Sequence, residues 1–81
     1  MVEYQPISCA QHERLEFSVL RKIPLLLEYR DGAERIRHTV LPLDVATRNG
    51  AEWLKFKKLR GEEVMEIRLD AIISFAEAGR S

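Results

Sequence analysis

The 81-residue sequence predicts an α+β fold that is mainly β, in which an N-terminal helix over about residues 9–20 caps a small five-stranded Sm-like β-barrel. Three observations support this prediction. A helix-capping pattern precedes a single amphipathic stretch, short alternating segments fill residues 24–75, and turn-forming dipeptides separate them. An OB fold or an SH3-like barrel also fits the pattern loosely. A chain of this length is expected to form one domain, residues 1–81.

The predicted helix begins after Ser8, a residue type that caps helices by accepting a hydrogen bond from a backbone N–H. Gln11 stands three positions later and completes a capping box. Pro24 prevents the helix from continuing. The apolar residues expected to face the sheet are Leu15, Phe17, Val19 and Leu20.

Cys9 lies in the first turn of this helix and is the only cysteine, which excludes an internal disulfide and a cysteine-based zinc cluster. A thiol at this position can become reactive. No base partner is visible in the sequence. We therefore expect a small buried side chain that anchors the start of the helix to the sheet.

The hydrophobic period changes to that of a strand after Pro24. The expected strands are "LLLEYR", "ERIRHTVLPL", "AEWLKFKKL", "VMEIRL" and "AIISF". Asp-Gly at 31–32, Asn-Gly at 49–50 and "RGEE" at 60–63 are the expected turns. Pro42 limits the second strand to an edge or a bend. Asp70 separates the last two strands, and residues 77–81 are expected to be a frayed tail.

Catalytic motifs are absent from the sequence, so we expect no enzyme, no cofactor and no metal. His12 and His38 lie in different elements, and no HExxH, Gly-rich phosphate loop or GxSxG occurs. The Glu62–Glu63 pair falls in a turn and is expected to be a solvated tip, whereas His38 is expected at the core or its rim. The sequence shows neither a membrane span nor a signal peptide, so we expect a cytoplasmic protein.

The charges balance at 13 basic and 13 acidic residues, which argues against a protein whose main task is to coat nucleic acid. Their distribution is uneven. The stretch "WLKFKKLR", Trp53–Arg60, contains four cations and no acid. It could bind single-stranded RNA, with Trp53 and Phe56 stacking on bases and the lysines Lys55, Lys57 and Lys58 following phosphates. It could also be a strand whose charged outer face keeps an edge soluble, and the residue pattern slightly favours this second interpretation.

Glu13 and Glu16 give the helix an acidic side, because residues three apart lie near each other on a helix. This side could meet a basic partner. It could also be an ordinary solvated surface, and the residue pattern by itself favours the solvated surface.

Four segments of the sequence resemble the Rof (YaeO) family of small bacterial inhibitors of the transcription terminator Rho. They are "YQPISC" at 4–9, "LE" at 15–16, "LEYRDG" at 27–32 and "EIRLDAIISF" at 66–75. The resemblance implies an Sm-like barrel with an N-terminal helix. It also implies binding to the N-terminal RNA-binding domain of Rho, which blocks RNA loading.

The resemblance also implies where Rho would bind, and the free protein is expected to be monomeric. Family members present a carboxylate-rich helix start, but Ala10 and Gln11 stand here where acids would be expected. The interface is therefore expected to use hydrogen bonds and a turn in addition to charge. The residues expected to bind Rho are Tyr4, Gln5, Gln11, His12, Glu13, Glu16, Arg48 and Asn49.

Overall fold

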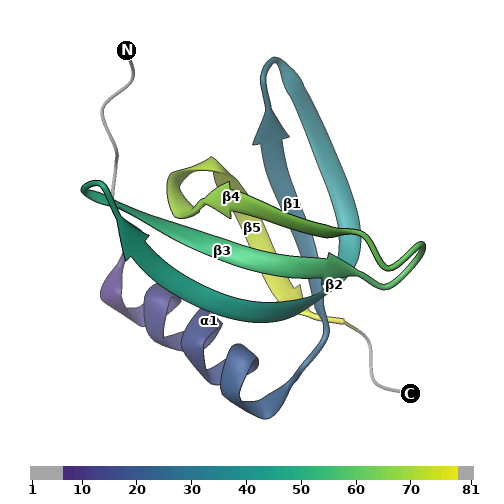
Figure 1. Ribbon diagram of the computed structural model, residues 1–81, viewed down its shortest axis with the longest axis horizontal. Coiled ribbons are helices and arrows are strands. Elements are labelled where there is room, and N and C mark those ends of the chain that lie inside the picture. Colours follow the sequence, from purple (N-terminus) through teal and green to yellow (C-terminus); the bar gives the residue numbers. More distant parts are fainter. Residues whose placement is uncertain (1–6, 79–81) are drawn as a thin grey trace.

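A computed structural model describes residues 7–78 as one helix on a bent, five-stranded antiparallel sheet (Figure 1). The elements in chain order are α1 (Cys9–Arg21), β1 (Leu25–Asp31), β2 (Glu34–Arg48), β3 (Ala51–Lys58), β4 (Val64–Arg68), the 3₁₀ turn η1 (Leu69–Ala71) and β5 (Ile72–Glu77). The strand order is β4-β3-β2-β1-β5. The predicted helix and five strands are confirmed.

The closed barrel is not confirmed. Within residues 7–78 the sheet is open, because β4 and β5 are its two edges and η1 joins them without a ladder between them. The observed architecture is therefore a strongly bent open sheet with a helix against it.

The bend is centred on β2, which belongs to two ladders. Residues 34–40 pair with β1, and residues 40–48 pair with β3. Pro42 lies just beyond the β1 ladder, where its missing N–H removes no bond to that strand, and the register to β3 shifts between Pro42 and Asp44. The predicted bend at Pro42 is confirmed, and the strand continues through it to Arg48.

The core fills the inside of this bend. Tyr29 and Phe56 lie at its centre with ring centroids 5.8 Å apart. The fully buried cluster consists of Leu15, Leu25, Leu27, Tyr29, Val40, Leu54, Phe56 and Leu69. The alternation predicted for β1 and β3 is therefore confirmed, and α1 contributes Leu15 to the cluster.

Two of the four helix residues expected to face the sheet do not do so. Phe17 is 49% exposed and Leu20 is 80% exposed. At about 100° per residue, they lie about 200° and 140° around the helix from Leu15, so they cannot share its face. Leu15 and Ser18 are the buried residues of the helix.

The helix begins as predicted, except at Cys9. The Ser8 hydroxyl accepts a hydrogen bond from the Gln11 backbone N–H at 3.2 Å, which confirms the cap. The expectation that Cys9 is buried is wrong, because the side chain is exposed. Ile7, the residue before the cap, packs against the core instead. An apolar residue at that position commonly fixes how the chain enters a helix.

The observed turns differ from the predicted ones in detail. Asn49 and Gly50 have φ of 52° and 77°, as the predicted tight turn requires. The first turn is shifted by one residue, because Asp31 pairs with Glu34 and leaves Gly32–Ala33 as the loop.

The C-terminal end of the described chain is more ordered than expected. Strand β5 continues to Glu77, and the Ala78 N–H donates to the Pro24 carbonyl at 2.9 Å. The expected frayed tail therefore does not include residues 77 and 78, and residues 79–81 lie outside the described part.

Ser8→Ala should lower the free energy of unfolding by about 1 kcal/mol, because the Gln11 N–H loses its partner at the helix start. Urea unfolding followed by circular dichroism measures this change. Ser74→Ala, an exposed serine in β5, is a control that should have a smaller effect. An unchanged midpoint for Ser8→Ala would show that the cap contributes nothing to stability.

Candidate partner-binding surface

The first turns of α1 and the β2–β3 hairpin lie together at one end of the molecule (Figure 1). A close side-chain contact joins them, with His12 Nε2 2.8 Å from Glu52 Oε2 on β3. This end therefore collects the described residues expected to bind Rho, which come from two segments far apart in the sequence. They are Gln11, His12, Glu13, Glu16, Arg48 and Asn49. Tyr4 and Gln5 lie outside the described residues.

His12 joins two elements. Its Nε2 contacts Glu52, and its Nδ1 lies 3.6 Å from Glu16 Oε1 one turn along the helix. The side chain is only partly exposed. His12 therefore positions the helix on β3 and contacts Glu16 on its own helix.

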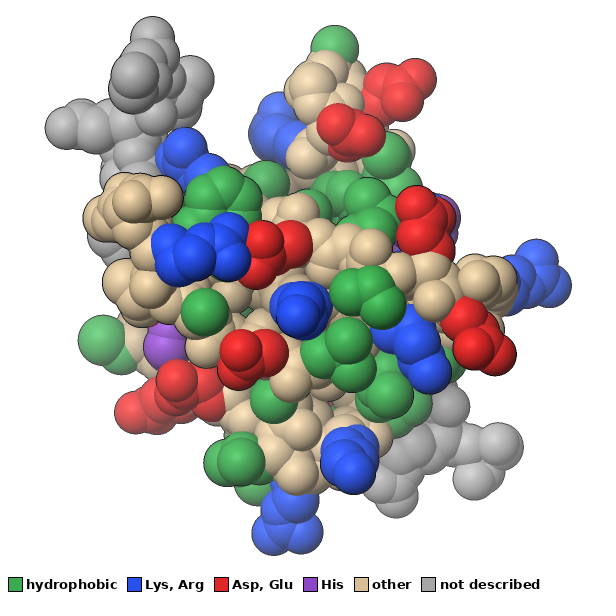
Figure 2. All heavy atoms as spheres, in the orientation of Figure 1, with side chains coloured by type: hydrophobic (Ala, Val, Ile, Leu, Met, Phe, Trp, Pro, Cys, Tyr) green, Lys and Arg blue, Asp and Glu red, His purple; other side chains and the backbone are tan. Residues whose placement is uncertain are grey.

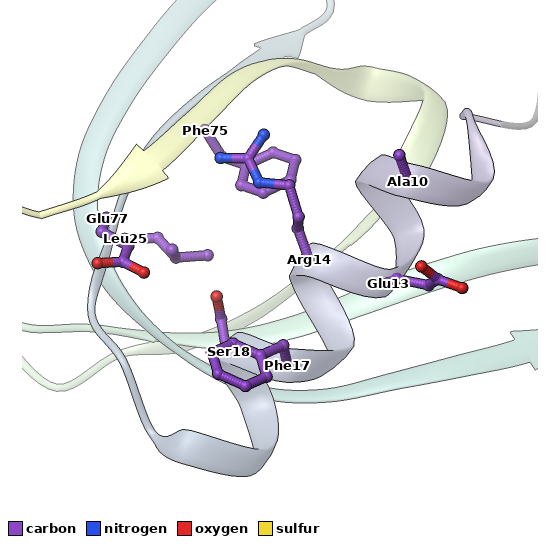
Figure 3. A pocket seen from close by; sticks show the side chains of 8 residues that line it. All are labelled: Ala10, Glu13, Arg14, Phe17, Ser18, Leu25, Phe75 and Glu77. Carbon is purple, nitrogen blue, oxygen red and sulfur yellow. The ribbon is translucent and has the colours of Figure 1, made fainter.

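Glu13 and Glu16 are both exposed, but they lie beside different hollows. Glu13 borders a hollow between α1 and β5, where the Arg14 guanidinium lies 4.9 Å from the centre of the Phe75 ring. Figure 3 shows the Glu13 carboxylate extending away from that contact. Glu16 borders a hollow between α1 and β2 that also contains Asp44. The acidic side is thus a ridge with a hollow on each flank.

Arg48 is held by two neighbours at the base of the hairpin. Its guanidinium donates to both oxygens of Glu66 on β4, at 2.9 and 2.7 Å, and lies 5.0 Å from the Trp53 ring centre. The hydrogen bond from Arg48 lowers the pKa of Glu66, and the same bond raises the pKa of Arg48. This bidentate geometry fixes the guanidinium plane. Arg48 is therefore a rigid, largely neutralised feature of the surface.

Asn49 has a clear structural role in the hairpin. With φ of 52° it occupies the left-handed region, which asparagine tolerates better than most residues. The Trp53 indole N–H donates to the Arg48 carbonyl at 3.4 Å and closes the hairpin base. The hairpin therefore places a tight turn of defined backbone conformation next to the start of the helix.

The basic stretch 53–60 is partly neutralised by strand β4 and the turn before it. Lys58 Nζ lies 3.3 Å from Glu63 Oε1, and Lys55 is paired in register with Glu66. Phe56 is fully buried and cannot stack on a base. On the face that Figure 2 shows, acidic and basic side chains are interspersed. A continuous RNA-binding track along Trp53, Lys55, Lys57 and Lys58 is therefore poorly supported.

Glu52 and Glu66 are the surface residues that sequence reasoning missed. Each pairs with an expected site residue, but the pairing depends on which strands lie side by side. No local motif marks either one.

Among residues 7–78, no group of three or more His, Cys, Asp or Glu side chains is placed to hold a metal ion. No helix in this part of the chain is long and apolar enough to span a membrane.

The fold defines a class of small α+β units with one helix against a bent antiparallel sheet. Proteasome accessory factor B/C of Arthrobacter aurescens contains a similar unit, with a TM-score of 0.76 and 20% identity. The match covers 95% of this chain and 13% of that one, so the present chain spans a small part of its length. This likeness concerns the fold alone.

The curated protein rof of Escherichia coli K12 is 34% identical over 73 residues, which cover 90% of this chain and 81% of that protein. Protein rof of Shigella flexneri matches to the same extent. The chain belongs to the Rof family. No protein-family profile matches it.

Glu66→Gln should make folding stability less sensitive to acid. Because the folded-state pKa of Glu66 is lowered, its pair with Arg48 contributes stability above the unfolded value of about 4.3. That contribution is lost as the pH falls through the folded value. The difference in urea midpoint between wild type and variant should therefore be largest above about pH 5 and shrink toward about pH 3.

The control for this series is Glu34→Gln, which changes an exposed carboxylate at the β1–β2 turn. Its difference from wild type should stay small throughout. A Glu66→Gln difference that does not change with pH would contradict the assigned role of the ion pair.

Proposed function

We propose that this Rof-family chain is a non-catalytic inhibitor of the transcription terminator Rho. In this proposal it binds the N-terminal RNA-binding domain of Rho in the cytoplasm, blocks RNA loading and so relieves termination. The observation that carries the proposal is the identity to protein rof of E. coli over 90% of the chain. The resemblance of the same segments to Rho inhibitors supplies the partner. The open sheet would correspond to an Sm-like barrel, and the free protein would be monomeric.

The end formed by α1 and the β2–β3 hairpin is the surface that we assign to Rho. An RNA-binding site is lined by cations, and the exposed Glu13 and Glu16 offer it opposite charge. Gln11 is also exposed in the first turn of the helix and can donate and accept hydrogen bonds. These three side chains would supply the polar contacts.

The hairpin would contribute a rigid, complementary surface to this interface more than it would contribute charge. The Arg48 guanidinium is already paired with Glu66 and stacked on Trp53, so its plane is fixed before a partner arrives. A fixed side chain loses little conformational freedom on binding. Arg48 and Asn49 would therefore form a rigid rim beside the acidic ridge.

This protein should compete with RNA for the primary site of Rho. Fluorescence anisotropy of a labelled pyrimidine-rich RNA on Rho should fall to its free value as the protein is added. Excess unlabelled RNA should in turn release the protein from Rho. A stable ternary complex in which RNA still occupies the primary site of Rho would overturn direct competition.

The double change Glu13→Lys, Glu16→Lys should abolish inhibition of Rho and leave the protein folded. Both side chains are exposed, so each reversal should cost about 0.5 kcal/mol of stability or less. Against a cation-lined site, like charges cost several kcal/mol, so the affinity should fall by two orders of magnitude or more. Competition with labelled RNA measures the affinity, and circular dichroism checks the fold.

A matched control has the same change in net charge at a different place. Glu34→Lys, Glu62→Lys reverses two exposed carboxylates in the β1–β2 and β3–β4 turns. It should inhibit Rho nearly as well as wild type. Equal loss of inhibition in both double variants would show that only net charge matters and that the acidic ridge is not the contact.

A further inference from the structure

A basic hollow lies at the opposite end of β3 from the surface assigned to Rho. The β2–β3 turn and the β3–β4 turn mark the two ends of this strand (Figure 1). Eight residues of extended strand separate the ends by about 25 Å. The hollow lies between residues 37–39 of β2 and residues 58–63, and has a volume of about 580 Å³. One bound partner could occupy the helix end and leave this hollow open.

The charge in the hollow is unbalanced. Arg37, Lys58 and Arg60 line it with one carboxylate, Glu63, so three cations against one acid leave an excess of two positive charges. The hollows on either side of α1 carry an acidic excess instead. Positive charge in a concave site raises the local potential more than the same charge on a flat surface. The charge and shape therefore favour an anion.

Hydrogen bonds hold the walls of the hollow in place. The Lys58 N–H donates to the Glu63 carbonyl at 2.8 Å, and the Leu59 N–H donates to the Thr39 carbonyl of β2 at 3.2 Å. The Lys58 side chain is only 22% exposed, so it lies against the wall of the hollow. The β3–β4 turn is thereby tied to β2.

We propose that this hollow binds the phosphate group of a nucleotide, either free or within an RNA strand. A phosphate offers several anionic oxygens, which match the forked donors of Arg37 and Arg60 and the ammonium group of Lys58. The Thr39 hydroxyl also lines the hollow and can donate to an oxygen. The volume lies in the range of small-molecule sites. Leu59, 45% exposed at the hollow, provides an apolar contact for a sugar or base.

Glu63 competes with the phosphate for Lys58. Its carboxylate lies 3.3 Å from the ammonium group and is 64% exposed, so it can turn into solvent when another anion arrives. Arg37 has one contact at the limit of an ion pair, with Nη2 3.9 Å from Glu28 Oε1. Arg37 and Lys58 are thus weakly engaged and can exchange partners.

The test is a titration of the full chain followed by its amide nuclear magnetic resonance signals. The probes are inorganic phosphate, adenosine 5′-monophosphate, adenosine, and a short oligouridylate without terminal phosphates. Inorganic phosphate and the monophosphate should shift the amides of residues 37–39 and 58–63 in a saturable way, and adenosine should not. Saturable shifts with the oligouridylate would identify phosphodiesters of RNA as the source, and their absence would identify free nucleotides. Equal binding of adenosine, or no saturable shift with any phosphate probe, would overturn the proposal.

Variants distinguish a defined phosphate-binding site from diffuse electrostatic attraction to the protein surface. Arg37→Gln and Arg60→Gln should each weaken binding of the monophosphate by roughly threefold to tenfold. Lys55→Gln removes an exposed cation from the same sheet outside the hollow and should change binding by less than about twofold. If Lys55→Gln weakens binding as much as Arg60→Gln, the attraction is diffuse and no site exists.

Removing the competing carboxylate of Glu63 gives a test in which the affinity for the monophosphate should rise instead of fall. Glu63→Gln should tighten binding of the monophosphate by roughly threefold, because Lys58 is then released to the phosphate. Glu34→Gln makes the same charge change at the distant β1–β2 turn and should have little effect. Retained dispersion of the amide signals shows that each variant is folded. Weaker binding by Glu63→Gln would contradict the arrangement proposed here.

Discussion

The structure depends on one strand that belongs to two ladders. β2 pairs with β1 through its first half and with β3 through its second, so the sheet must turn between them. The turn occurs where Pro42 lacks an N–H and the register shifts. Bending the sheet brings the buried faces of β1 and β3 toward each other, which lets a chain of this size enclose Tyr29 and Phe56. A flat sheet of the same strands would leave that face open.

The bend also decides where the helix can lie. α1 contributes one large side chain, Leu15, to the fully buried cluster, and the His12–Glu52 contact ties its first turns to β3. Since Phe17 and Leu20 remain exposed, the helix covers the core along a narrow stripe. Most of its circumference, including Glu13 and Glu16, is left available for contacts outside the chain.

Ion pairs between neighbouring segments neutralise some parts of the surface and leave other parts charged. Arg48 meets Glu66, Lys58 meets Glu63, and Arg35 lies 3.2 Å from Glu28, so much of the outer face of the sheet is close to neutral. Among the described residues, the hollows beside α1 keep an acidic excess and the hollow at the β3–β4 turn keeps a basic one. A protein with no net charge can in this way offer two different electrostatic surfaces.

Local patterns in the sequence are sufficient to predict the helix, the five strands and part of the core. Ser8 as the helix cap, the Asn49–Gly50 turn and the bend at Pro42 follow from backbone preferences. The alternation that buries Leu25, Leu27 and Tyr29 follows from the hydrophobic period of a strand. These properties depend on residues a few positions apart. The tertiary structure alone decided that Ile7 packs where Cys9 was expected, that the sheet stays open, and which cation meets which acid. Glu52 and Glu66 reach His12 and Arg48 only because strand register brings distant segments together, and a local pattern contains no information on register between segments that are far apart.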